Sequence, residues 1–185
     1  MAATVDVLTN GYANDRVAST VVLIREGDAV IVVDSGMVAS RDTLLDSLHQ
    51  LGIHEDEVTD VIFSHHHPDH TLNAALFRSA RFHDVWAVYQ GDVWDDRNEE
   101  FEGAPSVSLF DTPGHTPQDI STLVRTQEGL VVCTHLWWSS EGPEIDPLAY
   151  DQEQLEKSRR AVMALGPVLI IPGHGRAFAP SEFST

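Results

Sequence analysis

The sequence is short of cysteine and of positive charge. Its 185 residues include a single cysteine, Cys133, so no disulfide can form within the chain. Lysine and arginine number 11 against 29 acidic residues, which gives a formal charge of −18. A surface this negative repels phosphate backbones and anionic lipid headgroups. We therefore expect neither a long nucleic acid nor a membrane among the partners of this protein.

Long apolar runs are missing as well. No run approaches the roughly 20 residues needed to cross a bilayer, and the first residues lack the basic start and apolar core of a signal peptide. Together with the lone cysteine, which suits a reducing compartment, these absences predict a cytoplasmic protein. The length predicts one domain over residues 1–185, and the hydrophobic fraction of 42% is typical of a folded globular chain.

Strand-like segments dominate the chain, and two helical segments interrupt them. Leucines at helical spacing predict a helix that ends near Gly52, and a second helix is expected over residues 151–165. Residues 91–103 contain six acidic residues and are expected to form a solvated loop. This order favours layered sheets with helices outside over a plain alternation of strand and helix. Strands are predicted over residues 5–8, 17–25, 29–33, 58–64, 85–89, 107–110, 120–125, 130–134 and 168–171.

Histidine is the residue in excess, with ten copies. The densest group spans residues 64–70 and reads Ser-His-His-His-Pro-Asp-His. Side chains two residues apart in an extended chain project to the same side, so His65 and His67 can reach one ion. The proline that follows turns the chain. Asp69 and His70 can then present a carboxylate and an imidazole to an adjacent point.

Two more histidines stand beside glycines where predicted strands end, His115 in Thr-Pro-Gly-His-Thr and His174 in Pro-Gly-His-Gly. Imidazole and carboxylate donors suit zinc near neutral pH, and also iron or manganese. The alternative is a histidine-rich surface loop, but four ligand-type residues within six positions favour a metal site. His49 and His54 fit the surface alternative, and His83 is expected to be unrelated to the site.

These residues resemble the motifs of the metallo-β-lactamase superfamily over nearly the whole chain. The stretch Gln154–Ala161 also resembles the branch that contains metallo-β-lactamase domain-containing protein 1. Asp34, which ends the strand before the first helix, matches a common aspartate that supports a metal ligand. The His-x-His-x-Asp-His motif and the two later motifs are matched by His65, His67, Asp69, His70, His115 and His174.

The resemblance implies an α+β fold, namely a four-layer αβ/βα sandwich formed by one metallo-β-lactamase-like domain over residues 1–185. The site is expected at one edge of the sandwich. The resemblance also implies two metal positions, the first made by His65, His67 and His115 and the second by Asp69, His70 and His174. We expect one or two zinc ions there, with iron or manganese as alternatives.

One position departs from the family pattern. The superfamily usually has an aspartate that bridges two metals at the strand end after the second motif, and here that strand end carries His135. A neutral imidazole binds one ion, whereas a carboxylate can bridge two. We therefore expect His135 to be a ligand or near-ligand and the second ion to bind less tightly. The alternative is that a loop acid such as Asp146 folds back to supply the missing carboxylate.

The resemblance implies a metal-dependent hydrolase. A bound ion lowers the pKa of water from about 15.7 to near 7, and the metal-bound hydroxide would attack a small ester, thioester, lactone or amide. Asp69 is the predicted catalytic residue, because it can orient that water and take its proton. Trp137, Trp138 and Thr116 are candidates for the substrate pocket. Adjacent strand residues face opposite ways, so we expect at most one of the two tryptophans to face it.

Three other functions fit the same motifs. The absence of a bridging carboxylate leaves room for an iron-dependent sulfur dioxygenase or another redox enzyme. A small phosphodiesterase or nuclease is compatible as well, because bound cations create a local positive focus inside a negative surface. The third alternative is a non-catalytic metal-binding domain. The sequence leaves open which small molecule is the substrate and whether the chain forms a homo-oligomer.

Overall fold

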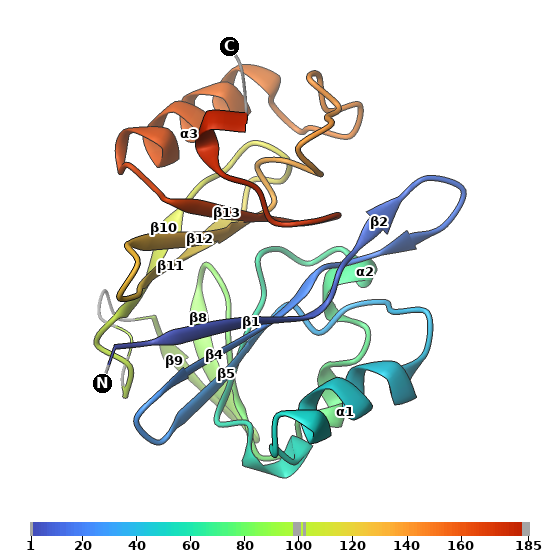
Figure 1. Ribbon diagram of the computed structural model, residues 1–185, viewed down its shortest axis with the longest axis vertical. Coiled ribbons are helices and arrows are strands. Elements are labelled where there is room, and N and C mark those ends of the chain that lie inside the picture. Colours follow the sequence, from blue (N-terminus) through green and yellow to red (C-terminus); the bar gives the residue numbers. More distant parts are fainter. Residues whose placement is uncertain (1, 98–100, 102, 183–185) are drawn as a thin grey trace.

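Two mixed β-sheets face each other in the computed structural model, which describes residues 2–97, 101 and 103–182 (Figure 1). The first sheet contains, in spatial order, β1 (Thr4–Thr9), β4 (Val21–Glu26), β5 (Ala29–Val33), β6 (Asp60–Ile62), β7 (Arg81–His83), β8 (Ala87–Gln90) and β9 (Val93–Asp96). The second contains β10 (Val107–Asp111), β11 (Ile120–Arg125), β12 (Leu130–Thr134) and β13 (Leu169–Pro172). Two short strands, β2 (Tyr12–Ala13) and β3 (Val17–Ala18), form a separate hairpin.

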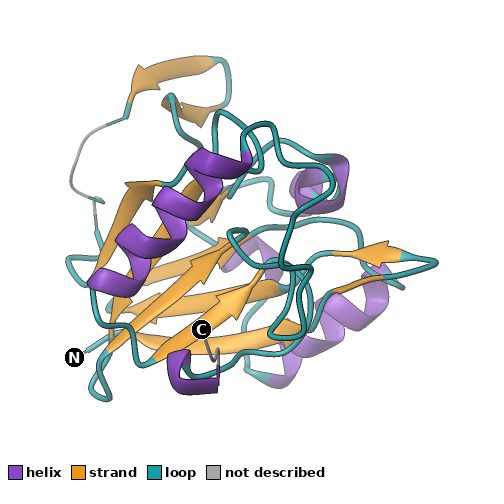
Figure 2. Cartoon of the chain, turned by 90° about the horizontal axis from the view of Figure 1, so that it is seen from above, coloured by secondary structure: helices purple, strands orange, loops and turns teal. Residues whose placement is uncertain are grey.

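Helices cover the outer faces of the sheets (Figure 2). Helix α1 (Arg41–Gln50) buries Leu44 and Leu48 against the first sheet. Helix α3 (Gln152–Ala164) buries Leu155 and Val162 against the second. A side-chain oxygen caps the N-terminus of each helix, from Ser40 in α1 and from Asp151 in α3. Helix α2 (Pro68–Thr71) is one turn long, and 3₁₀ turns occupy Glu55–Glu57, Ala74–Leu76 and Pro180–Glu182.

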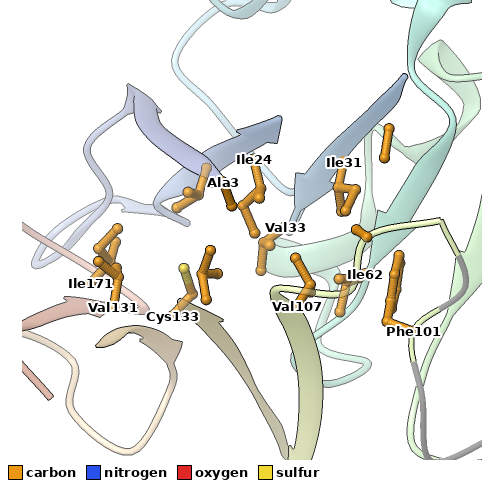
Figure 3. Close-up of a cluster of buried hydrophobic side chains, with 14 of the residues drawn as sticks. Ala3, Ile24, Ile31, Val33, Ile62, Phe101, Val107, Val131, Cys133 and Ile171 are labelled. Atoms are coloured by element: carbon orange, nitrogen blue, oxygen red, sulfur yellow. The ribbon is translucent and has the colours of Figure 1, made fainter. Parts of the chain in front are cut away.

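The alternation of side chains along the strands separates three apolar layers. In β4, Val22 and Ile24 face the second sheet, whereas Val21 and Leu23 face α1. In β12, Val131 and Cys133 point into the space between the sheets, and Val132 points toward α3. Figure 3 shows the central layer, where Ile31 and Val33 of β5 meet Val107 and Cys133. The period of two along each strand therefore produces the four-layer αβ/βα sandwich that the family resemblance implies.

Two local predictions differ from the structure, and one strand has no counterpart among the predictions. The strand expected over residues 17–25 is divided, because β3 ends at Ala18 and β4 begins at Val21. β7 was not predicted, since its three residues are held as a strand by pairing with β6 and β8 rather than by a local pattern. Within the expected acidic loop, residues 93–96 form the edge strand β9, while residues 98–100 and 102 lie outside the described part. Among the described residues, no helix has the length and apolar character of a membrane span.

The functional residues gather where strands of both sheets end. β5 and β6 run parallel, as do β12 and β13, so the carboxyl ends of each pair meet at one edge. Backbone hydrogen bonds join the two halves there. The Ile120 amide donates to the Ser64 carbonyl at 2.9 Å, and the Thr20 amide donates to the Gly173 carbonyl at 2.8 Å. Loops from distant parts of the sequence are thus fixed beside one another.

Candidate metal centre

Six histidines and one aspartate converge at this edge. Three of the histidines follow β6, one follows β10, one directly follows β12 and one follows β13. Their ligand atoms form overlapping groups of three, with the atoms of each group within 4.8 Å of one another. The groups are His65, His67 and His115; Asp69, His70 and His174; and His65, His70 and His135. The first two groups coincide with the two metal positions that the family resemblance implies.

The first group presents imidazole nitrogens to a common point. His115 Nε2 lies 3.1 Å from His67 Nδ1, and the rings of His65 and His67 have centroids 4.6 Å apart. His65 bonds through Nδ1 to the Ser64 hydroxyl at 3.0 Å, so its Nε2 points away from that bond. This Nε2 is buried and has no hydrogen-bond partner. An unpartnered polar atom in the interior costs free energy unless a ligand such as a cation satisfies it.

The second group is held from behind by protein oxygens. His70 Nδ1 donates to Asp34 Oδ2 at 2.7 Å, and His174 Nδ1 donates to the Ala18 carbonyl at 2.8 Å. The Nε2 atoms of both rings therefore face Asp69, whose Oδ2 lies 3.4 Å from His70 and 3.6 Å from His174. His70 Nε2 is buried, and the Asp69 carboxylate is the charged group that faces it. Such outer contacts fix the tautomer and orientation of an imidazole that binds metal.

Asp34 and Asp146 support one ligand histidine each. Asp34 has a backbone φ of 53°, a region that residues other than glycine rarely adopt. This conformation lets its Oδ1 accept the Ser64 amide at 2.8 Å while Oδ2 accepts His70. Asp146 plays the same part for His115, since its Oδ2 accepts His115 Nδ1 at 2.7 Å. Sequence reasoning assigned Asp34 to this supporting position, but for Asp146 it offered only a metal-bridging role.

His135 lies between the two groups. Its ring centroid is 4.2 Å from that of His115 and 4.6 Å from that of His65. Its Nε2 is 3.2 Å from His174 Nε2, and its Nδ1 is buried without a hydrogen-bond partner. Gly173, at the end of β13, leaves space for the ring because it has no side chain. A Cβ at this position would lie 2.2 Å from His135 Cδ2. The imidazole therefore occupies the centre of the site, where the family usually has an aspartate.

The protonation states favour metal binding. Burial, reinforced by neighbouring imidazoles, lowers the pKa of His65 and His135 well below the usual value. Burial likewise lowers the pKa of His67. The free lone pairs of neutral imidazoles are thus available near neutral pH. Although burial opposes ionisation, hydrogen bonding and attraction from His70 lower the pKa of Asp69 to about 2, so this carboxylate is ionised.

His70 behaves in the opposite way. Burial disfavours its charged form, but Asp34 and Asp69 on either side raise the pKa to about 9. This part of the site therefore stabilises a positive charge between two carboxylates. A divalent cation supplies such a charge, which makes the donor set and its electrostatics suited to a metal ion.

A cavity of about 320 Å³ opens onto part of the histidine cluster. Its polar floor contains His67, Asp69, His115, His135 and His174. Its walls are apolar and come from the β2–β3 hairpin, the loop before α1, the start of α2 and the chain that follows β12. The wall residues are Ala13, Val17, Met37, Pro68, Trp138 and Leu148. Such a combination of apolar walls and few polar groups is typical of small-molecule sites.

Of the three candidate pocket residues, one lines the cavity and two are buried elsewhere. Trp138 lines the cavity, and its indole nitrogen donates to Asp146 Oδ2 at 3.1 Å. Trp137 is buried in the layer under α3, with the Arg159 guanidinium 5.7 Å from its ring centroid. Thr116 is buried, is not among the residues that line the cavity, and donates through its amide to Asp119 at 2.7 Å.

Replacing His135 with aspartate is expected to tighten binding of the second metal ion. The carboxylate adds a negative charge and a second donor atom at the centre of the site, and a Coulomb term of a few kcal/mol at this range corresponds to at least about tenfold in affinity. Zinc titration followed by competition with a chelator measures the change. An affinity and stoichiometry equal to those of the wild type would contradict the charge argument.

Known proteins of one family resemble this chain in sequence. A family model described as the metallo-β-lactamase superfamily matches residues 14–107. Metallo-β-lactamase domain-containing protein 1 of Xenopus laevis is 36% identical over 94% of this chain and 80% of its own length. The Homo sapiens protein of the same name is 32% identical over 80% of this chain, and the match spans 59% of its own length.

Solved structures show the same fold. A Thermotoga maritima protein, given as a candidate metallo-β-lactamase, superposes with a TM-score of 0.76 at 24% identity, over 97% of this chain and 100% of its own. An N-acyl homoserine lactone hydrolase, with the product N-hexanoyl-L-homoserine at its catalytic metal centre, superposes with a TM-score of 0.66 at 19% identity, over 88% of this chain and 84% of its own. By its sequence, fold and histidine motifs, this chain belongs to the metallo-β-lactamase superfamily.

Proposed function

We propose that this protein is a metal-dependent hydrolase of small esters, thioesters, lactones or amides. The observation that carries the proposal is a pair of buried imidazole nitrogens without hydrogen-bond partners, His65 Nε2 and His135 Nδ1. Both lie among further histidines, and His135 lines the floor of an apolar cavity. A purely structural cluster would satisfy these atoms with protein hydrogen bonds. We propose zinc as the metal, in one or two positions.

The residues would have different roles in metal binding and catalysis. His65, His67 and His115 would hold one ion, and Asp69, His70 and His174 a second, with His135 close to both. When bound, the metal supplies acidified water and polarisation of a carbonyl oxygen. Asp69 faces the cavity and is ionised, so it can accept a proton from a water molecule in front of it. The apolar walls exclude bulk water, which strengthens each electrostatic contact at the floor.

The cavity favours a substrate with an apolar group. No lysine or arginine belongs to the residues that line it, so a phosphate or carboxylate would meet no cationic side chain there, only the proposed metal ions. Val17 and Leu148 are exposed at its rim, where they can cover an aliphatic chain. A solved relative with the same fold holds a hexanoyl product at its metal centre. These features together support carbonyl chemistry on an apolar substrate over cleavage of phosphodiesters.

Elemental analysis of protein purified without added metal tests this proposal. Zinc at one or two ions per chain supports it, and so does hydrolysis of a lactone, thioester or ester panel that is lost with chelator and restored with zinc. Iron at one ion per chain with no hydrolysis would instead support a redox enzyme. Turnover confined to a phosphodiester would support the nuclease alternative. A chain that binds no metal would overturn the proposal.

Replacing Leu148 with serine is expected to weaken turnover of long-chain substrates selectively. Each methylene buried on an apolar wall contributes about 0.8 kcal/mol, or close to fourfold in kcat/KM. In p-nitrophenyl esters of two to eight carbons, the rise of kcat/KM with chain length should flatten in L148S. Ile145→Ser is the matched control, because Ile145 lies on the same loop, is 72% exposed and does not line the cavity. An equal flattening in both variants would contradict a binding role for Leu148.

A further inference from the structure

The loop at residues 139–150 contains a buried acid among exposed apolar neighbours. Ile145, Leu148 and Tyr150 are exposed by 72%, 63% and 74%, whereas Asp146 is exposed by only 5%. These three side chains therefore contribute little burial to the loop. A buried carboxylate is stable only when hydrogen bonds replace its water. The contacts of Asp146 are thus one attachment of this part of the loop, beside the hydrogen bond from Arg159 Nη1 to the Glu144 carbonyl at 3.0 Å.

Both oxygens of Asp146 are used. Oδ2 accepts His115 Nδ1 at 2.7 Å and Trp138 Nε1 at 3.1 Å, and Oδ1 accepts the Leu148 amide at 2.9 Å. The same loop is tied to the turn that carries His115, since the Tyr150 amide donates to the His115 carbonyl at 2.9 Å. One carboxylate therefore connects a candidate metal ligand with two residues of the cavity wall, Trp138 and Leu148.

We propose that Asp146 is a positioning residue that couples metal binding at His115 to the order of this loop. The proposal rests on the metal site proposed above. A cation at His115 Nε2 would polarise the ring and strengthen the bond from Nδ1 to Asp146, because charge-assisted hydrogen bonds are the stronger ones. That bond also holds the loop. Metal binding and loop ordering are then two coupled equilibria. Such coupling is reciprocal: if metal binding favours the ordered loop by some factor, the ordered loop increases metal affinity by the same factor.

The coupling has a consequence for the cavity. Trp138 and Leu148 form part of the apolar wall, and both make hydrogen bonds to Asp146. The wall is therefore fully formed when the first metal position is filled. The cavity would then bind an apolar substrate best in the state that can also react with it.

Amide hydrogen exchange on the full chain, metal-free and loaded with zinc alone, tests the coupling. In the wild type, zinc should slow exchange at Leu148 and Tyr150 at least tenfold more than at the amides of α1. Asp146→Ala should abolish this extra protection and weaken zinc binding by about 10- to 100-fold, the usual effect of removing the partner of a metal ligand. Asp146→Asn keeps an acceptor oxygen, so it should restore part of both effects and provides a second variant if alanine impairs folding.

Glu144→Gln is the matched control, because Glu144 is an exposed acid of the same loop. It should behave as the wild type in exchange and in zinc affinity. If wild-type protein binds zinc but the loop amides respond no more than α1, the coupling is wrong while the proposed function stands. Equal zinc affinity in wild type and both Asp146 variants would also overturn it. If the wild type binds no zinc, the proposed function itself fails.

Discussion

Replacing His67 with alanine is expected to empty the first metal position and lower kcat/KM by roughly 1,000-fold or more, since the substitution removes both water acidification and carbonyl polarisation. His67 belongs to the group with His65 and His115, and its Nδ1 lies 3.1 Å from His115 Nε2. It is only partly buried, so alanine leaves little cavity and the fold should persist. Metal content per chain and the hydrolysis rate are the two measurements.

The control for this experiment is another histidine. His54→Ala removes an imidazole that lies outside the site and is exposed on the surface, so metal content at the strand ends and activity should not change. The two substitutions delete the same atoms, and a difference between them reports position rather than residue type. Full zinc occupancy in the His67 variant would remove this residue from the ligand set.

Replacing Asp69 with asparagine is expected to lower kcat by about 100- to 10,000-fold, the range associated with loss of a general base. Its pKa of about 2 means that the carboxylate is ionised throughout the neutral range. The asparagine amide cannot take a proton and is a weaker donor to a cation. We therefore expect reduced occupancy of the second metal position together with the loss of rate, measured by metal analysis and by initial velocities.

Excess zinc separates the two roles of Asp69. If it acts only as a ligand, saturating zinc should recover most of the rate in the asparagine variant. If it also accepts a proton, the rate stays low at full occupancy. Asp28→Asn, in an exposed turn between β4 and β5, removes a carboxylate far from the site and should retain the wild-type rate. A wild-type rate in Asp69→Asn would exclude Asp69 from catalysis.

The histidine motifs can be recognised in the sequence because their residues lie close together along the chain. His65, His67, Asp69 and His70 lie within six positions, and a strand followed by a proline turn is enough to bring them together. The layered sheets are predictable for a similar reason, since the alternation along each strand is visible without any partner. This local information is enough to predict the family and a candidate metal site.

The remaining features depend on contacts between distant residues. Asp146 meets His115 across 31 positions, and no local pattern indicates which acid of an acidic loop will be buried. The division between Trp137 in the core and Trp138 at the cavity follows from how the chain leaves β12. β9 consists of exposed residues, two of them acidic, so only its pairing with β8 identifies it as a strand.

The ligand set is shared by the two halves of the sandwich. His65, His67 and His70 come from the end of a strand in the first sheet, whereas His115, His135 and His174 follow strands of the second. A cation bound among them would therefore act as a cross-link between the sheets, beside the backbone bond from Ile120 to Ser64. Because a ligand that binds only the folded state stabilises it, removing the metal would weaken this edge first. The metal-free protein should then unfold at a lower temperature than the metal-loaded protein.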